Sequence, residues 1–394
     1  MNRLIKKPVS LFLALCSALS LTAHAGEPAT QEVNRLPVFS WDCVPQYMHI
    51  RKWNKYTPDE INYLATFPLV TLEKANGTRV FKTNEDGTLA AARAIKAVNP
   101  STKILYYRNV IVHYPGYRDD EAINTMPGGF LVGRKGENML IRGRQDAYDL
   151  TKPEVRDWWV ANPDSICADP AIDGLFLDGI IKILQTGYLK RLLGADKQVG
   201  MVAGFQTMME ETRKALGPDK IMLANVVRAG TPDSGLVEIK RFDGSYMENF
   251  DGNKDHVAKG IEAFQTAARE GYLMAFTTGL SDLNTEEGNL NPLQTDEIRQ
   301  GLTKDRDHAE RFRYLLAIFL ICAEKNSYFL AHDGYLANKS KVWMKRPPEL
   351  QRPLGPPKGP AVRNGYVYTR EFAHAKVRLD LEKQVGEIEW LQPK

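Results

Sequence analysis

The sequence contains few of the residues that metal sites, disulfide scaffolds and nucleic-acid surfaces require. Its 394 residues include four cysteines and seven histidines, and none of these fall into CxxC, HxH or HExxH spacings. A zinc site of the common kinds is therefore not expected, and no metal or other cofactor is predicted. The 52 lysines and arginines nearly balance 48 acidic residues, and the net charge of +4 is too small to indicate a nucleic-acid partner.

Glycine-rich phosphate-binding motifs and long hydrophobic runs are also missing. No GxGxxG or Walker motif is present, which excludes dinucleotide binding and nucleotide-phosphate chemistry of the usual kinds. Beyond the N-terminus, the most apolar stretch is Tyr314 to Ala323, which is short enough to be a buried helix, so no stable membrane span is expected. The hydrophobic content of 43% is ordinary and excludes a disordered scaffold.

The first 25 residues are typical of a secretory signal peptide. Arg3, Lys6 and Lys7 provide a positive start, the stretch from Val9 to Leu21 is apolar, and Ala23-His24-Ala25 has the small-x-small cleavage pattern. Cleavage after Ala25 removes those three cations and leaves a nearly neutral protein. The sequence therefore predicts a periplasmic or extracellular location.

Cleavage would also remove Cys16 and leave Cys43, Cys167 and Cys322. At most one intramolecular disulfide could then form, and the sequence does not decide which pair would form it. The oligomeric state also stays open at this stage.

After a linker at residues 26–37, short apolar runs alternate with amphipathic helical segments. The predicted strands are Pro45–Ile50, Pro68–Glu73, Lys103–Arg108, Gly174–Asp178, Lys220–Val226, Asp243–Glu248, Tyr272–Thr277 and Ser327–Ala331. The predicted helices include Leu89–Val98, Met201–Leu216, His256–Glu270 and Lys304–Glu324, and two more begin at capping boxes, Thr57-Pro58-Asp59-Glu60 and Thr151-Lys152-Pro153-Glu154. Eight strands in alternation with helices predict an α/β fold, a (β/α)8 TIM barrel, over residues 38–340.

Residues 341–394 have a different character. A proline-rich connector leads into three β segments, of which Lys376–Leu381 alternates polar and apolar side chains as a half-buried strand does. This pattern predicts a small C-terminal antiparallel β module. Covering the side of the barrel is its simplest role, and glycan binding is an alternative.

Polar side chains follow several of the predicted barrel strands, where TIM barrels carry out their chemistry. Asp178 ends the fourth strand and Glu248 ends the sixth, so we expect these two to form a glycosidase pair, with Asp178 as nucleophile and Glu248 as general acid/base. Glu73, Arg108 and Asn225 end other strands and are expected to orient substrate hydroxyls. The long connection from Val110 to Asp149 is expected to form a wall of the site.

Aromatic residues near the same strands could stack on sugar rings. The candidates are Trp41, Tyr47, Tyr106, Tyr107, Tyr246 and Phe250. His49 is a further substrate-binding candidate, although a structural role is the simpler interpretation.

Several segments together resemble a known family. They are Phe39-Ser40-Trp41-Asp42, Tyr47-Met48-His49, Val70-Thr71-Leu72-Glu73-Lys74, Tyr148-Asp149-Leu150, Trp158-Trp159, Gly174-Leu175-Phe176-Leu177-Asp178-Gly179, Tyr246-Met247-Glu248-Asn249-Phe250, Leu354-Gly355-Pro356-Pro357 and Tyr368-Thr369-Arg370-Glu371-Phe372. In these segments the chain resembles the hypothetical glycosyl hydrolase family fifteen of bacteria, and it is more distantly similar to polygalactosaminidase-type and α-galactosidase-like barrels. The resemblance implies a TIM barrel, a sugar substrate and catalytic acids at Asp178 and Glu248, and by fold-level analogy an α-linked substrate.

The residues and the resemblance thus predict a secreted glycoside hydrolase that acts on a poly- or oligosaccharide with a carboxylate pair and a retaining mechanism. Two alternatives remain. The first is a non-catalytic carbohydrate-binding barrel of the cell envelope, in which the carboxylates would be separated or blocked by arginine or lysine. The second is an isomerase or lyase with His49 or a lysine as base, for which no phosphate or metal site is visible.

Overall fold

A computed structural model describes residues 35–392, except for residues 186, 232, 249, 251, 281–307, 333 and 339–342. The predicted signal peptide, most of the predicted linker, and the start of the helix predicted at Lys304 lie outside the described residues. The boundary predicted at residues 340 and 341 also falls outside them.

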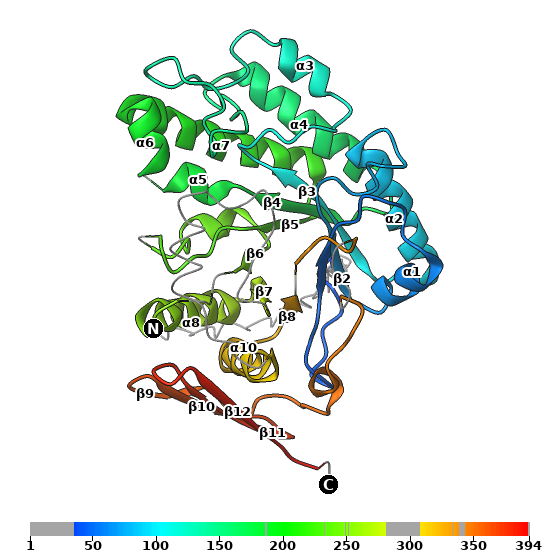
Figure 1. The fold of residues 1–394 in the computed structure, drawn as a ribbon, viewed down its shortest axis with the longest axis vertical. Coiled ribbons are helices and arrows are strands. Elements are labelled where there is room, and N and C mark those ends of the chain that lie inside the picture. The colour runs from blue at the N-terminus through cyan, green and yellow to red at the C-terminus, as the bar shows by residue number, and fades with distance from the viewer. Residues whose placement is uncertain are drawn as a thin grey trace, which may run out of the picture. The chain divides into compact units, whose positions relative to one another are not determined.

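Eight parallel strands form the central sheet, and they neighbour one another in the order of the sequence (Figure 1). They are β1 (Met48–Ile50), β2 (Leu69–Leu72), β3 (Lys103–Asn109), β4 (Gly174–Asp178), β5 (Ile221–Ala224), β6 (Gly244–Met247), β7 (Leu273–Gly279) and β8 (Ser327–His332). Bridges from Gln46 to Phe329 and from Arg51 to Leu336 bring the first strand against the last. The predicted (β/α)8 barrel is confirmed, and every predicted barrel strand overlaps an observed one.

Helices follow the strands around the barrel. They are α1 (Pro58–Leu64), α2 (Asn84–Val98), α3 (Asp120–Thr125), α4 (Pro153–Cys167), α5 (Ile180–Leu184), α6 (Tyr188–Leu193), α7 (Ala195–Leu216), α8 (Lys254–Arg269) and α10 (His308–Cys322), with 3-10 turns at Glu238–Arg241 and Pro348–Gln351. The apolar segment that ends at Ala323 is the buried helix that the sequence predicts. No helix in the described part of the chain has the length and apolar content of a membrane span.

The two predicted capping boxes have different outcomes. At α1, Glu60 N–H donates to the Thr57 hydroxyl and the Glu60 carboxylate accepts from Thr57 N–H, so the capping box is confirmed. At α4 the prediction is wrong, because the N-cap residue is Lys152 and no side chain caps the helix. The Thr151 hydroxyl instead donates to Asp149 Oδ1, and Lys197 pairs with the other oxygen of that carboxylate.

The three cysteines in the described part of the chain are free thiols. Cys43 is half-buried, and Cys167 and Cys322 are buried in the core. No disulfide therefore joins any of the three.

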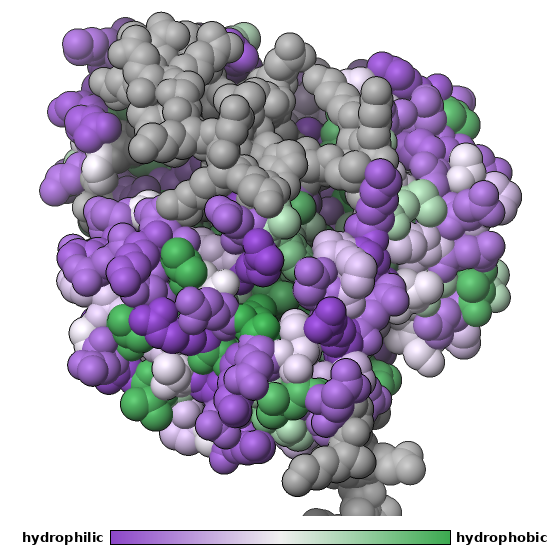
Figure 2. Space-filling model, turned by 60° about the horizontal axis from the view of Figure 1, so that its bottom comes forward, coloured by the Kyte–Doolittle hydropathy of each residue, from purple (hydrophilic) through white to green (hydrophobic). Residues whose placement is uncertain are grey.

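A second sheet of four antiparallel strands follows the barrel. Its strands are β9 (Val362–Asn364), β10 (Val367–Glu371), β11 (Ala375–Asp380) and β12 (Val385–Trp390), in the order β12-β11-β10-β9. The alternation predicted from sequence is confirmed, because Val377 and Leu379 are buried, Lys376 before them is exposed and Arg378 between them is half-exposed. Figure 2, with this end of the molecule turned forward, shows a mainly hydrophilic surface with scattered hydrophobic side chains.

The buried face of this sheet packs against α10 (Figure 1). The buried guanidinium of Arg370 donates to the carbonyl oxygens of Leu320, Ile321 and Ala323 at the C-terminal end of α10, and it pairs with Glu324 at 2.9 Å. The last carbonyl oxygens of a helix have no N–H donor within the helix, and the Arg370 guanidinium provides hydrogen-bond donors for them here. The module therefore covers the side of the barrel and caps one of its helices.

Replacing Arg370 should destabilise the protein markedly. Arg370→Met removes a buried donor from the carbonyls at the end of α10 and the nearer of two cations from Glu324, at a cost of about 3 kcal/mol in the free energy of unfolding. Urea unfolding measures this loss. Arg378→Met, on the same sheet but with a half-exposed side chain, is the matched control and should cost less than about 1 kcal/mol. Equal losses in the two variants would contradict the capping role.

Candidate active site

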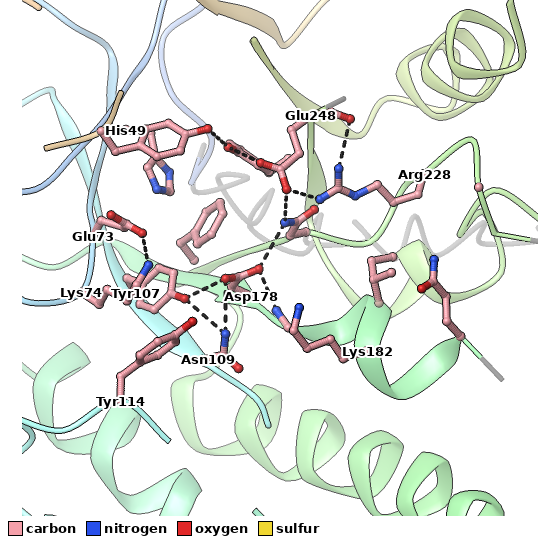
Figure 3. A pocket seen from close by; sticks show the side chains of 18 of the residues that line it. His49, Glu73, Lys74, Tyr107, Asn109, Tyr114, Asp178, Lys182, Arg228 and Glu248 are labelled. Carbon is pink, nitrogen blue, oxygen red and sulfur yellow. Dashed lines mark hydrogen bonds and ion pairs between the residues drawn. The ribbon is translucent and has the colours of Figure 1, made fainter. Parts of the chain in front are cut away.

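A cavity of about 420 Å³ opens at the C-terminal ends of the barrel strands. Side chains from the strands β1 to β6 or the segments after them, and from the segment after β8, line it, and many of their polar ends point toward one another (Figure 3). Its volume lies within the roughly 300–1,000 Å³ of small-molecule sites. Tyr114 and Arg142 contribute from the long connection between β3 and α4, so the prediction that this connection forms a wall of the site is confirmed.

Asp178 lies at the centre of the cavity and accepts four hydrogen bonds. Oδ2 accepts from the Tyr107 hydroxyl at 2.7 Å and from Asn109 Nδ2 at 3.3 Å, and Oδ1 accepts from Gly179 N–H at 2.7 Å and from Asn225 Nδ2 at 3.2 Å. Burial alone would raise the pKa of Asp178, but the charges of Lys74 and Lys182 and these hydrogen bonds lower it below its ordinary value. The carboxylate is therefore ionised and firmly oriented.

Backbone geometry explains the glycine that follows this carboxylate. Gly179 has a φ of 85°, and a Cβ there would come within 2.4 Å of Asn109 Oδ1. Only glycine combines this left-handed conformation with such close contact. The turn places the Gly179 N–H against Asp178 and leaves Asn109 free to bind the same carboxylate.

Asn225 connects the two carboxylates that the sequence analysis predicts to act as a pair. Its Nδ2 donates to Asp178 Oδ1 at 3.2 Å and to Glu248 Oε1 at 3.4 Å. The Asn225 N–H also donates to the Leu177 carbonyl at 2.8 Å, which fixes this residue beside the end of β4. Asp178 and Glu248 therefore face the same space across one amide group, as the paired-carboxylate prediction requires.

Besides the Asn225 amide, the side chains of Arg228 and Tyr246 bind Glu248. Arg228 forms an ion pair with its Oε1 and donates to its backbone carbonyl at 3.1 Å, and the Tyr246 hydroxyl donates to Oε2 at 3.2 Å. The Tyr246 hydroxyl also bonds the Tyr335 hydroxyl. Burial and the charge of Asp178 raise the pKa of Glu248, but Arg228 and the hydrogen bond from Asn225 together lower it below its ordinary value.

Glu73 and Lys74 form a second charged pair in the wall of the cavity. Lys74 pairs with Glu73 Oε1, and Arg51 lies 3.3 Å from Glu73 Oε2. The Lys74 ammonium also lies 4.9 Å from the centre of the Tyr107 ring. The side chain of Glu73 is thus in the site, as predicted, with its charge compensated by two cations.

The aromatic lining is centred on Phe176, which points inward from β4. His49 and Tyr246 meet its ring edge to face at 4.7 Å and 5.1 Å, and Tyr107 stacks beside it at 5.8 Å. Burial lowers the pKa of His49 to about 4, so this imidazole is neutral near pH 7. His49, Glu73, Asn225 and Tyr246, all predicted for substrate binding, line the cavity.

Three predicted substrate-binding residues lie elsewhere, and those predictions need correction. Arg108 points outward from β3, because side chains alternate along a strand, and its guanidinium stacks 3.9 Å from the centre of the Tyr117 ring. Tyr47 is fully buried in the core. Trp41 packs against Phe372 of the C-terminal segment. None of the three lines the cavity.

The other aromatic candidates also divide between the cavity and the core. Tyr107 lies in the cavity, whereas Tyr106 donates to Asn162 of α4 and Phe250 stacks on Phe276 in the core. Sequence reasoning missed Arg228 and Lys182 as site residues. Their signal is weak, because each lies four residues beyond a strand end, Lys182 on the short helix α5 and Arg228 in a loop, where tertiary contacts decide the direction of the side chain.

Among the described residues, no group of three or more His, Cys, Asp and Glu side chains could hold a metal ion. The carboxylates of the cavity are instead bound by arginine, lysine, amide and hydroxyl groups.

Paired carboxylates at the C-terminal ends of parallel barrel strands are the arrangement of a (β/α)8 glycoside hydrolase. The chain belongs to the hypothetical glycosyl hydrolase family 15, whose family model matches residues 96–376. The family resemblance and the glycoside hydrolase class predicted from sequence are thereby confirmed, and a carbohydrate substrate follows from the class. Among curated protein sequences, no match to this chain is found.

Solved structures with a similar fold are distant in sequence. The glycoside hydrolase domain of PelA from Pseudomonas aeruginosa is 15% identical, with 64% of this chain and 87% of that chain covered and a TM-score of 0.43. Alpha-L-fucosidase isoenzyme 2 from Paenibacillus thiaminolyticus is 14% identical, with 78% and 48% covered and a TM-score of 0.47. At these values the likenesses carry no information on substrate.

Proposed function

We propose that this protein cleaves O-glycosidic bonds in a poly- or oligosaccharide by a retaining mechanism, with Asp178 as nucleophile and Glu248 as general acid/base. The observation that carries the proposal is the amide of Asn225, whose nitrogen binds both carboxylates. Two oxygens bound by the two hydrogens of one amide lie roughly 5–6 Å apart. Retaining glycosidases separate their carboxyl groups by roughly 5–5.5 Å, whereas inverting enzymes need roughly 6.5–9.5 Å.

The environment of Asp178 suits a nucleophile. Its lowered pKa keeps it ionised, and its four donors fix the direction of attack on the anomeric carbon. In the first step, the Asp178 oxygen forms a bond to that carbon while the bond to the leaving oxygen breaks and Glu248 gives its proton to that oxygen. In the second step Glu248 takes a proton from water, whose oxygen displaces Asp178.

The coupling between the two carboxylates supports this change of role. The negative charge of Asp178 raises the pKa of Glu248 in the free protein. When Asp178 is bonded to the sugar, that charge is lost and the pKa of Glu248 falls. Glu248 therefore loses its proton more readily, and is in the carboxylate form, at the moment when a base is required.

Arg228 should set the alkaline limit of activity. Because Glu248 must be protonated in the first step and Arg228 lowers its pKa, activity should be highest in the acid range and fall as the pH rises. Arg228→Met removes the cation and leaves burial and Asp178, which both raise the pKa of Glu248. The alkaline limb of the kcat/KM profile should then move up by about one unit or more.

Two further variants separate charge from packing. Arg228→Lys keeps the positive charge, so its alkaline limb should stay close to that of the unmodified protein. Lys240→Met, an exposed lysine in the 3-10 turn before β6 and outside the cavity, should leave the whole profile unchanged. An unchanged profile in Arg228→Met would count against Glu248 as the proton donor.

A glycan digest tests the proposal directly. The protein without residues 1–25 is incubated with a panel of bacterial and plant polysaccharides, and new reducing ends are measured beside a variant that carries both Asp178→Asn and Glu248→Gln. Proton NMR of the first product shows whether its anomeric configuration is retained. If both proteins release the same amount of reducing ends, Asp178 and Glu248 are not the catalytic pair. A first product of inverted configuration would refute the retaining mechanism.

One observation favours the alternative of a non-catalytic carbohydrate-binding barrel. Arg228 forms an ion pair with Glu248, which is a block of the kind expected of a binding protein. The carboxylates are not separated, however, and Asp178 has no comparable ion pair among the described residues. Glycan binding that survives the double substitution, together with no hydrolysis of any glycan, would favour this alternative.

We also propose that the protein is exported, on the basis of the N-terminal pattern that ends at Ala25. Cell fractionation and N-terminal sequencing of the native protein test this proposal. A cytoplasmic protein that still begins at Met1 would refute it.

A further inference from the structure

Several cationic side chains line the cavity. Of the described residues that line it, Lys74, Arg142, Lys182 and Arg228 are cationic. Lys74 is paired with Glu73, and Arg228 is paired with Glu248. Arg142 also has an interaction partner, so Lys182 is the cation whose function in the cavity needs an explanation.

Lys182 lies on α5, four residues after Asp178. Its side chain lines the cavity and extends toward its open space beside Asp178 (Figure 3). Within the described part of the chain, its ammonium has no hydrogen-bond partner and no carboxylate within 4.0 Å. An ammonium has three donors, and none of those of Lys182 is used by another described residue of the protein, so they are available to a ligand.

The charged groups around Lys182 do not fully compensate its burial. Burial lowers the pKa of Lys182 below its ordinary value, Asp178 and Glu248 raise it, and Arg142 and Arg228 lower it further. Asp178 itself depends more on Lys74 than on Lys182 for its lowered pKa. Lys182 is therefore not the main cation that keeps Asp178 ionised. A negatively charged group of a ligand could form an ion pair with the Lys182 ammonium.

We propose that Lys182 binds an acidic group, a carboxylate or a sulfate, on the sugar that occupies the subsite beside Asp178. The substrate class is then an acidic glycan. This inference rests on the proposed function for the meaning of the subsite, but recognition of an acidic sugar can be measured without hydrolysis. A charge-assisted hydrogen bond from a half-buried ammonium would favour the acidic sugar over its neutral counterpart.

Matched monosaccharides test the inference by binding alone. Galacturonic acid, glucuronic acid and galactose 6-sulfate are compared with galactose and glucose by NMR titration of the unmodified protein at low salt. We expect acidic sugars to bind more tightly than the neutral ones, and Lys182→Met to weaken the acidic sugars at least about tenfold while leaving neutral sugars unchanged. The uronic acids and the sulfated sugar together show which acidic group is preferred.

Two control variants complete the design. Lys182→Arg keeps the charge and should restore most of the preference, and Lys190→Met, an exposed lysine on α6 outside the cavity, should bind as the unmodified protein does. Equal affinity for acidic and neutral sugars, no binding of any acidic sugar, or no effect of Lys182→Met would overturn the inference.

The outcomes separate the inference from the proposed function. Lys182-dependent binding of acidic sugars with no hydrolysis of any acidic glycan would refute the catalytic proposal and keep the inference. Hydrolysis that depends on Asp178, with no preference for acidic sugars, would refute the inference and keep the catalytic proposal.

Discussion

Asp178→Asn should reduce kcat by at least about 10,000-fold, because the amide cannot form the glycosyl bond that the carboxylate forms. The substitution changes few atoms, so the shape of the cavity is preserved. The hydrogen bonds adjust unequally: the Tyr107 hydroxyl can accept from the new amide, whereas the Asn109 amide would meet another donor. A modest loss of stability is therefore expected, and kinetics must be measured below the melting temperature of the variant.

Asp86→Asn is the matched control for this experiment. Asp86 lies on α2, pairs with the half-exposed Arg118 and does not line the cavity. Its variant should keep full activity. Residual activity of Asp178→Asn within about tenfold of the unmodified protein would remove Asp178 from the nucleophile's role.

Glu248→Gln should produce the second largest loss, about 100-fold to 10,000-fold in kcat on natural glycans. The loss should depend on the leaving group. An aryl glycoside with a strongly acidic phenol needs no proton to leave, so its bond to the sugar should still break, and the glycosyl group should remain on Asp178.

Azide then provides a sharp measurement. As a nucleophile that needs no base, it should attack the sugar held on Asp178 and release a glycosyl azide, which restores turnover in Glu248→Gln. Glu371→Gln, an exposed substitution in β10, is the control. Its kcat should equal that of the unmodified protein with every leaving group, and azide should not restore or raise it. A loss that is the same for every leaving group and insensitive to azide would contradict the acid/base assignment.

The barrel was predictable from sequence because its strands are short apolar runs with clear ends. Gly174–Asp178 has the same bounds in the prediction and in the structure. Asp178 and Glu248 could be predicted for the same reason. Burying a carboxylate at the end of an apolar strand costs free energy, so its presence there indicates a site that uses it. Parallel strands in sequence order then bring such residues to one end of the barrel.

The remaining site residues depend on the direction of individual side chains. Arg108 and Asn109 are adjacent in sequence, yet one faces the helices and the other binds Asp178, because the pleat alternates. A shift of one residue in the assigned register reverses both. Arg228 and Lys182 lie in a loop and a short helix, whose paths depend on tertiary contacts. The failed capping box at Thr151 has a similar cause, since Asp149 and Lys197 offered its hydroxyl a better partner.

The contact between Arg370 and the end of α10 also limits how this chain can be divided. From Arg35 onward the polypeptide forms one compact unit. A gene fusion or an expression design that ended the protein at the proline-rich connector would leave α10 with open carbonyls and an uncovered apolar side. We therefore expect the barrel and its small sheet to be inherited and transplanted together, so that any exchange of substrate range between relatives would proceed through the loops of the cavity rather than through loss of the C-terminal strands.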